Sequence, residues 1–146
     1  MVYIKGYRLS LLLQVLYQLI KWDITLRFSA YSAWKPALTS PSGTVSSNAH
    51  LATAQYVAKH LALVVRKSPY PFNCMRRTLA LKTLLNQQGI APTLHIGVKF
   101  DDNKQLAAHA WLSLVGECLN DTADNVAQYS EITDDTQKLI QALATQ

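Results

Sequence analysis

Cysteine is scarce in this sequence: two of the 146 residues are cysteine, Cys74 and Cys118. Two cysteines are too few for a disulfide framework in a chain of this length, so we expect a reducing compartment and a cytoplasmic protein. A signal peptide is not visible, because polar residues interrupt the apolar stretch 9–20 and no small-residue cleavage site follows it. The stretch is also shorter than the roughly 17–25 apolar residues that a membrane span needs, so we expect no span.

A dense run of lysine and arginine is also missing. The net charge is +5 at pH 7, yet the nearest approach to a basic cluster is Arg76, Arg77 and Lys82. A solvated basic face explains this group more simply than a nucleic-acid site, so we expect no nucleic-acid partner. Internal repeats are absent too. The composition, 49% hydrophobic and 16% charged, is typical of one globular domain spanning 1–146.

Apolar residues recur at helical spacing in the N-terminal part, 1–67. A stripe over 9–20 predicts a helix that packs this stripe on the rest of the domain. The stripe consists of Leu9, Leu12, Leu13, Leu16 and Ile20. A second helix is predicted over about 48–66. Proline, glycine and serine are frequent in 34–48, which predicts a long loop between the two helices.

The segment 68–132 has the pattern of the core of this single domain, the part that contains the candidate catalytic residues. Asn73 is a good N-cap for a central buried helix that starts at Cys74, and Gly89 suits the end of that helix. Alternating apolar residues then predict antiparallel strands. We place them over 93–100, over 106–115 with a turn at 116–117, and from residue 118 to 121. Helices followed by an antiparallel sheet indicate an α+β fold, and 133–146 should add a terminal helix.

Three residues of this core have the chemistry of a thiol nucleophile and its helpers. At a helix start, free N–H groups and the macrodipole favour the thiolate of Cys74 and can hold an oxyanion. His109 lies in a predicted strand between small neighbours, which leave space for a general base. Asp121 follows on the next strand, where a carboxylate can orient an imidazole. Each signal alone fits a structural role as well or better, but their order along the chain favours catalysis.

The other candidates are weaker. His95 alternates with Leu94 and Ile96, so we expect it to face solvent. Cys118 is expected to be a small packing residue. A Cys2His2 zinc site would need both cysteines and two of these histidines, and no Cys-x2-Cys or His-x3-His spacing supports it. We therefore expect no metal and no cofactor.

Strand parity sets a condition on Asp121. A two-residue turn at 116–117 would place Asp121 on the face opposite to His109. We therefore expect a three-residue connection or a bulge, which would pair Leu114 with Cys118 and bring Asp121 diagonal to His109.

Several motifs appear in a specific order along the chain. They are Cys74 to Leu81 (CMRRTLAL), Leu94 to Val98 (LHIGV), Ala108 to Trp111 (AHAW) and Leu119 to Asp121 (LND). Together they resemble the leader peptidases of lasso-peptide biosynthesis, which carry a papain- or transglutaminase-like core. The match covers about 70–130, and as an ordered set it is specific, although each piece alone is not.

The resemblance implies a cysteine peptidase that removes the leader from a ribosomally made precursor peptide. It implies Cys74 as nucleophile, His109 as base and Asp121 as orienting residue. Fused members of the family carry a winged-helix domain that recognises the leader, and 1–70 does not have its pattern. The resemblance therefore implies a stand-alone peptidase that works with a separate leader-recognition protein and a macrolactam-forming cyclase.

Two other functions remain open from the sequence. The same three residues on the same core can transfer an acyl group to an amine, as in transglutaminases and arylamine acetyltransferases, because both reactions pass through a thioester. The domain can also be a non-catalytic peptide-binding scaffold, although a binder has no need of all three groups.

Overall fold

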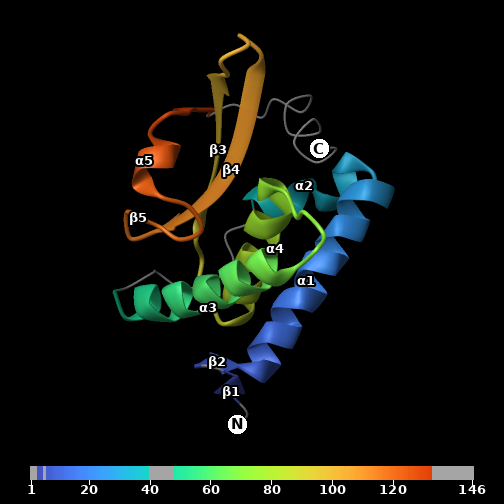
Figure 1. The fold of residues 1–146 in the computed structure, drawn as a ribbon, viewed down its shortest axis with the longest axis vertical. Helices are drawn as coiled ribbons and strands as arrows, with labels where there is room; N and C mark the ends of the chain where they lie inside the picture. The colour runs from blue at the N-terminus through green and yellow to red at the C-terminus, as the bar shows by residue number, and fades with distance from the viewer. Residues whose placement is uncertain (1–2, 5, 40–47, 133–146) are drawn as a thin grey trace.

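Helices dominate the first half of the chain and an antiparallel sheet the second, as predicted for an α+β fold (Figure 1). The computed structural model describes residues 3–4, 6–39 and 48–132. The helices are α1 (Leu9–Phe28), α2 (Tyr31–Thr39), α3 (Asn48–Lys67), α4 (Cys74–Gln87) and α5 (Ala123–Val126). The strands are β1 (Tyr3–Ile4), β2 (Tyr7–Arg8), β3 (Thr93–Phe100), β4 (Leu106–Leu114), β5 (Glu117–Cys118) and β6 (Ser130–Glu131).

The central helix α4 begins and ends at the predicted residues. The side chain of Asn73 accepts a hydrogen bond from the Arg76 N–H at 3.2 Å, which is the expected N-cap. At the other end Gly89 has a φ of +75°, and the Ile90 N–H donates to the Leu85 carbonyl at 3.0 Å. This pattern is a Schellman C-cap, which needs the left-handed conformation that glycine adopts without strain.

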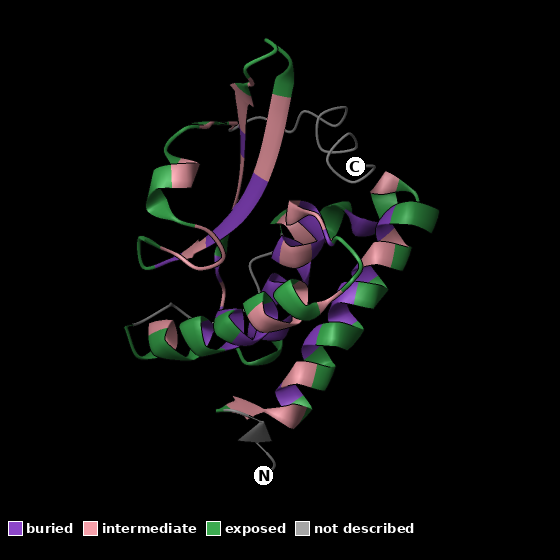
Figure 2. Cartoon of the chain, in the orientation of Figure 1, coloured by how far each residue is buried: buried purple, intermediate pink, exposed green. Residues whose placement is uncertain are grey.

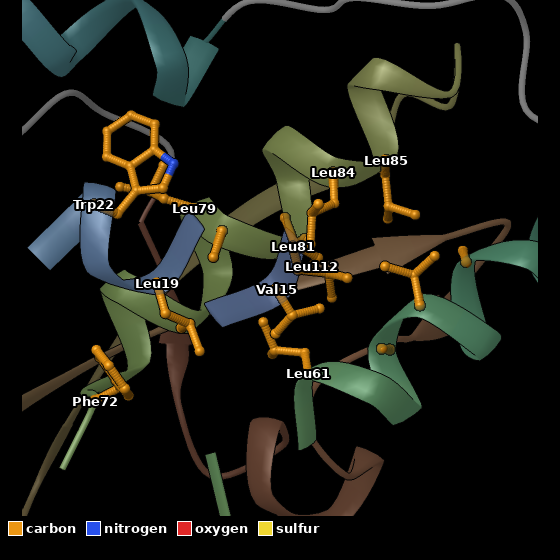
Figure 3. Packing of buried hydrophobic residues seen from close by; sticks show 14 of the residues in the cluster. Val15, Leu19, Trp22, Leu61, Phe72, Leu79, Leu81, Leu84, Leu85 and Leu112 are labelled. Carbon is orange, nitrogen blue, oxygen red and sulfur yellow. The ribbon is translucent and has the colours of Figure 1, made fainter. Parts of the chain in front are cut away.

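Helix α4 is the centre of the hydrophobic core. It packs against α1, α3 and β4, and its side chains Leu79, Leu81 and Leu85 are almost fully buried. Figure 3 shows Leu81 beside Val15 of α1 and Leu112 of β4, with Leu79 nearer to Leu19 and Trp22 of α1. Burial of a leucine side chain contributes roughly 1.5–3 kcal/mol, so this cluster fixes the position of the helix that carries Cys74.

The sheet has the order β5-β4-β3-β6, with each neighbouring pair antiparallel. The long β3–β4 hairpin pairs His95 with Trp111 and Gly97 with His109, so these four side-chain positions share one face. The end of β4 that carries Leu112 is buried against the helices, whereas the tip of the hairpin is exposed (Figure 2). The sheet therefore presents His109 near the boundary between core and surface.

The predicted packing face of the first helix is wrong. The buried positions of α1 lie on another face, and its buried apolar side chains are Leu11, Val15, Leu19, Trp22 and Leu26. The predicted stripe members Leu13, Leu16 and Ile20 are exposed, and a row of exposed apolar side chains runs along the helix. That row consists of Leu13, Leu16, Tyr17, Ile20, Ile24 and Phe28. Because α1 is apolar on two faces, periodicity alone does not identify the packed one.

The predicted loop over 34–48 is also partly wrong, because α2 continues to Thr39 with Pro36 inside it. Trp34 is buried and meets the ring of Tyr31 edge to face at 4.8 Å between centroids. This tertiary packing outweighs the unfavourable proline. The predicted terminal helix over 133–146 lies outside the described residues.

One buried ion pair joins α1 to α4. Arg76 is 3% exposed, and its Nε lies 2.5 Å from Oδ1 of Asp23. Arg27, one turn further along α1, lies 3.1 Å from the same carboxylate. Burial works to raise the pKa of Asp23, but the hydrogen bonds and charges of the two arginines outweigh it and lower that pKa. Arg76 is therefore a buried structural charge, which corrects the solvated basic face expected for it.

Among the described residues, α1 is the one helix whose length and hydropathy match a membrane span. One third of its most apolar 18-residue window is buried inside the domain. A core helix passes the same test of length and composition, and the buried face of α1 belongs to the core.

Candidate active site

Cys74 is the first residue of α4, and the cap at Asn73 determines its position. The side chain of Asn73 accepts a hydrogen bond from the Arg76 N–H. Its carbonyl accepts one from the Arg77 N–H at 3.1 Å. The first N–H groups of an α-helix have no helical carbonyl to bind. Those of α4 therefore point out of the end of the helix at which Cys74 lies. Cys74 is partly buried, not fully exposed, and makes no disulfide. Its thiol thus stands where partial positive charge is concentrated.

His109 reaches Cys74 from the middle of β4. The thiol and the imidazole hydrogen-bond to each other, and the backbone of the next residue, Ala110, also bonds to the cysteine sulfur. Thr78, one helical turn after Cys74, donates its hydroxyl to the Ala110 carbonyl at 3.0 Å. This buried hydrogen bond links α4 to β4 beside the site, so helix and strand hold the thiol and the imidazole together.

Asp121 hydrogen-bonds to Nε2 of His109, which leaves Nδ1 for the thiol. The carboxylate is itself held by the Thr122 N–H at 2.7 Å and by the Asn125 amide at 2.8 and 3.0 Å. Asp121 is therefore fixed by its own loop and by the start of α5. A second ring nitrogen bound to a carboxylate orients an imidazole and selects its tautomer.

The register expected between β4 and β5 is wrong. The hairpin between β4 and β5 has a two-residue turn, Val115-Gly116, with φ angles of +52° and +79°, and it pairs Leu114 with Glu117. Both central residues have positive φ, as in a type I′ turn. Strict continuation of that register would put Asp121 opposite Ala110, on the wrong face. The strand β5 ends at Cys118 instead, and the chain bends before it reaches Asp121.

The neighbouring Asn120 makes this bend possible. Its Oδ1 accepts the Leu112 N–H of β4 at 2.8 Å, in place of a strand carbonyl, and its Nδ2 donates to Thr78 at 3.0 Å. The side chain therefore satisfies the strand edge after the main chain has left it. Asn120 ties together α4, β4 and the bend, and this frees Asp121 to turn towards His109.

The charges of the site favour a thiolate beside an imidazolium. Burial works to raise the pKa of Cys74, but the His109 hydrogen bond, the Ala110 backbone bond and the charges of His109 and Arg77 outweigh it and lower that pKa. The bonds to Cys74 and Asp121 raise the pKa of His109 against the opposing effect of burial. Burial likewise opposes the lowered pKa of Asp121, which His109, Thr122 and Asn125 stabilise as a carboxylate. The pKa of Cys118 is raised, mainly by burial, so the two cysteines differ in reactivity.

Aromatic rings form a wall on one side of His109. The ring centroids of Tyr129 and Trp111 lie 5.0 and 5.8 Å from that of the imidazole. His95 also stacks on Trp111, with ring centroids 5.5 Å apart, and its nitrogens lie 2.5 Å from Glu131 and 2.6 Å from Ser113. The expectation that His95 faces solvent is therefore wrong. Its partner Glu131 lies on β6, a two-residue strand too short to be predicted from periodicity.

A pocket of about 220 Å³ opens over the three residues. Its lining consists of Cys74, Arg77, His109, Ala110, Asn120, Asp121 and Asn125. Among the described residues there is no group of three or more histidine, cysteine or acidic side chains arranged to hold a metal ion. The pocket brings together a thiol, an imidazole and a carboxylate that orients the imidazole, which are groups that covalent acyl chemistry uses.

The arrangement of helices against a curled antiparallel sheet, with a cysteine of the central helix facing a histidine of the sheet, defines an α+β protein of the papain and transglutaminase type. The model of one protein family, described as the transglutaminase-like superfamily, matches residues 10–134. The chain therefore belongs to the transglutaminase-like superfamily, and the predicted fold class is confirmed. No curated protein and no solved structure matches the chain.

Proposed function

We propose that the protein is a cysteine peptidase that removes the leader from a ribosomally made precursor peptide during lasso-peptide maturation. One observation carries the proposal: Cys74, at the start of α4, hydrogen-bonds to His109, which in turn hydrogen-bonds to Asp121. Membership of the transglutaminase-like superfamily supports acyl chemistry at this thiol. The ordered motifs described above support the leader as its substrate.

In the proposed reaction the Cys74 thiolate attacks the carbonyl carbon of the scissile peptide bond. A tetrahedral oxyanion forms, and the N–H groups of the first turn of α4 lie close enough to stabilise it. When the C–N bond breaks, His109 gives its proton to the leaving amine and the acyl group stays on Cys74 as a thioester. His109 then takes a proton from water, which attacks the thioester and releases the carboxylate of the cleaved leader. Asp121 stabilises the imidazolium in each step.

The test is incubation with a candidate precursor and a candidate leader-recognition protein, read by mass spectrometry. Two products whose masses sum to that of the precursor plus one water are expected. Cys74→Ala should abolish them. An uncleaved precursor in the presence of folded, alkylatable wild-type protein would contradict the proposal.

We further propose a separate leader-recognition protein and a macrolactam-forming cyclase as partners in the cytoplasm. These partners rest on the family resemblance. The recognition protein is expected to lower the apparent KM for the full-length precursor. Saturable cleavage at low micromolar precursor without that protein would contradict this part.

Acyl transfer is the second candidate, and membership of the transglutaminase-like superfamily favours it. Both reactions share the thioester and differ in what releases it. Trapping the acyl-enzyme and offering water or a primary amine distinguishes them, because an amide product formed in preference to the acid would indicate a transferase.

A further inference from the structure

Arg77 lies on the same face of α4 as the proposed nucleophile. It follows Cys74 by three residues, and residues at this spacing are neighbours on a helix surface, with Cβ atoms about 5–6 Å apart. Helical side chains lean towards the N-terminus, so that of Arg77 extends over the turn that begins with Cys74. It lines the catalytic pocket there. Against the effect of burial, and together with the bonds of His109 and Ala110, the charge of Arg77 lowers the pKa of Cys74.

The guanidinium of Arg77 has no fixed partner. Its Nε is buried, yet it has no hydrogen-bond acceptor among the described residues. No ion pair joins it to an acidic side chain in the part of the chain that the structure describes. The neighbouring Arg76, in contrast, pairs with Asp23. Buried polar groups without a partner are rare, so an unpaired cation beside a nucleophile points to negative charge that develops during the reaction.

Other side-chain donors of the pocket are already engaged. The amide of Asn120 donates to Thr78, and the amide of Asn125 donates to both carboxylate oxygens of Asp121. The imidazole is reserved for the leaving amine. Among the described residues that line the pocket, Arg77 is therefore the side chain whose donors are not committed elsewhere.

The tetrahedral intermediate creates the charge that such a donor fits. When the thiolate attacks a carbonyl, the negative charge moves to the oxygen bonded to the attacked carbon. One donor to such an oxygen is worth a factor of roughly 100 to 1,000 in kcat. A hydrogen bond from a charged group is about twice as strong as a neutral one, and a guanidinium stays protonated at any working pH.

We propose that Arg77 is a catalytic residue whose guanidinium donates a hydrogen bond to the oxyanion, beside the N–H groups at the start of α4. This inference rests on the proposed peptidase function and adds a residue to its mechanism. As the S–C bond forms, the electron pair of the C=O π bond moves onto the oxygen that Arg77 binds. As the pair returns, the C–N bond breaks and His109 gives its proton to the leaving amine. Arg77 keeps its own protons throughout.

The test compares two reactions of the same thiol. p-Nitrophenyl acetate acylates a thiolate through a tetrahedral oxyanion and releases p-nitrophenolate, which absorbance follows. Iodoacetamide alkylates the thiolate by displacement of iodide and forms no oxyanion. The acylation rate divided by the alkylation rate therefore cancels changes in the amount of thiolate. Every variant also carries Cys118→Ala so that one cysteine reacts, and the further change Cys74→Ala gives the background.

Arg77→Gln should lower this ratio by roughly 100-fold, and Arg77→Lys, which keeps a cationic donor, by roughly tenfold. The matched control is Arg66→Gln, which removes an exposed arginine of α3 outside the catalytic pocket and should keep the ratio. Circular dichroism checks that each variant is folded.

An unchanged ratio in the folded Arg77 variants, or an equal loss in Arg66→Gln, would overturn this inference and leave the peptidase proposal standing. A protein with both arginines intact that iodoacetamide alkylates at Cys74, but that p-nitrophenyl acetate does not acylate there, would contradict both.

Discussion

Gly97 lies directly across the β3–β4 pair from His109, under the side chains of Trp111 and Tyr129. A Cβ atom at position 97 would stand 2.8 Å from Cβ of Tyr129 and 2.9 Å from Cη2 of Trp111. The same two rings flank the imidazole of His109. The missing side chain of Gly97 thus allows the aromatic wall to close on the proposed base.

Gly97→Ala should therefore push this wall away from His109. We expect kcat to fall by roughly tenfold or more, and the free energy of unfolding to fall by about 1–3 kcal/mol, as for other overpacked sites. Gly89→Ala is the control, since its positive φ makes alanine destabilising by about 1 kcal/mol far from the site. Steady-state kinetics and urea denaturation of both variants measure the two effects. A Gly97→Ala enzyme with unchanged kcat would contradict the role of the wall.

Cys74→Ala should abolish cleavage and leave the fold intact, because alanine is compatible with the first helical position. Cys118→Ala should keep most activity, since Cys118 lies on β5 and does not line the catalytic pocket. Circular dichroism and product formation are the readouts. If the Cys118 variant were folded and as inactive as the Cys74 variant, the proposed nucleophile would be wrong.

Asp121→Asn should narrow the pH range of activity. The active thiolate–imidazolium pair exists above the lowered pKa of Cys74 and below the raised pKa of His109. Loss of the Asp121 charge removes one cause of the raised pKa of His109, so the upper pH limit moves to lower pH. The loss of cleavage on the alkaline side should therefore begin at lower pH than in the wild-type protein, as measured by the pH profile of kcat/KM. The matched control is Asp124→Asn on the exposed side of α5, and equal profiles for the two variants would exclude an orienting role for Asp121.

Asp23→Asn should destabilise the fold by about 3 kcal/mol, since it removes the carboxylate that pairs with the buried guanidinium of Arg76. The pKa of Asp23 is lowered in the fold, so this contribution is fully present above the pKa of the unfolded carboxyl and is lost as pH falls through the folded one. Urea denaturation at neutral and acidic pH measures it. Arg27→Gln is the control at the exposed end of the network and should change stability by less than about 1 kcal/mol.

The parts of the fold with strong local signals could be predicted from the sequence. Asn73 and Gly89 mark the ends of α4 through backbone chemistry that acts within a few residues. The alternation in β3 and β4 gave the hairpin in the same way. The fold class is therefore confirmed, and the structure brings together the three residues singled out for catalysis, although their roles stay a prediction.

The features that were missed depend on contacts distant in sequence. Helix α2 continues through Pro36 because Trp34 is buried by other elements, and local propensity does not include that burial. His95 is held by Glu131, 36 residues away on a strand with no periodic signal. The bend that brings Asp121 to His109 requires Asn120 to replace a strand carbonyl, which strand parity alone does not describe.

The proposed nucleophile Cys74 lies on helix α4, whereas the proposed base His109 lies on strand β4, which follows α4 in the sequence. Cys74 and His109 approach each other only after α4 has docked on β4, and Asp121 joins them after the bend has formed. An unfolded or partly synthesised chain therefore has an ordinary, slowly reacting thiol at position 74. The alkylation rate of Cys74 therefore reports whether folding is complete. It can be measured during synthesis or refolding without any substrate.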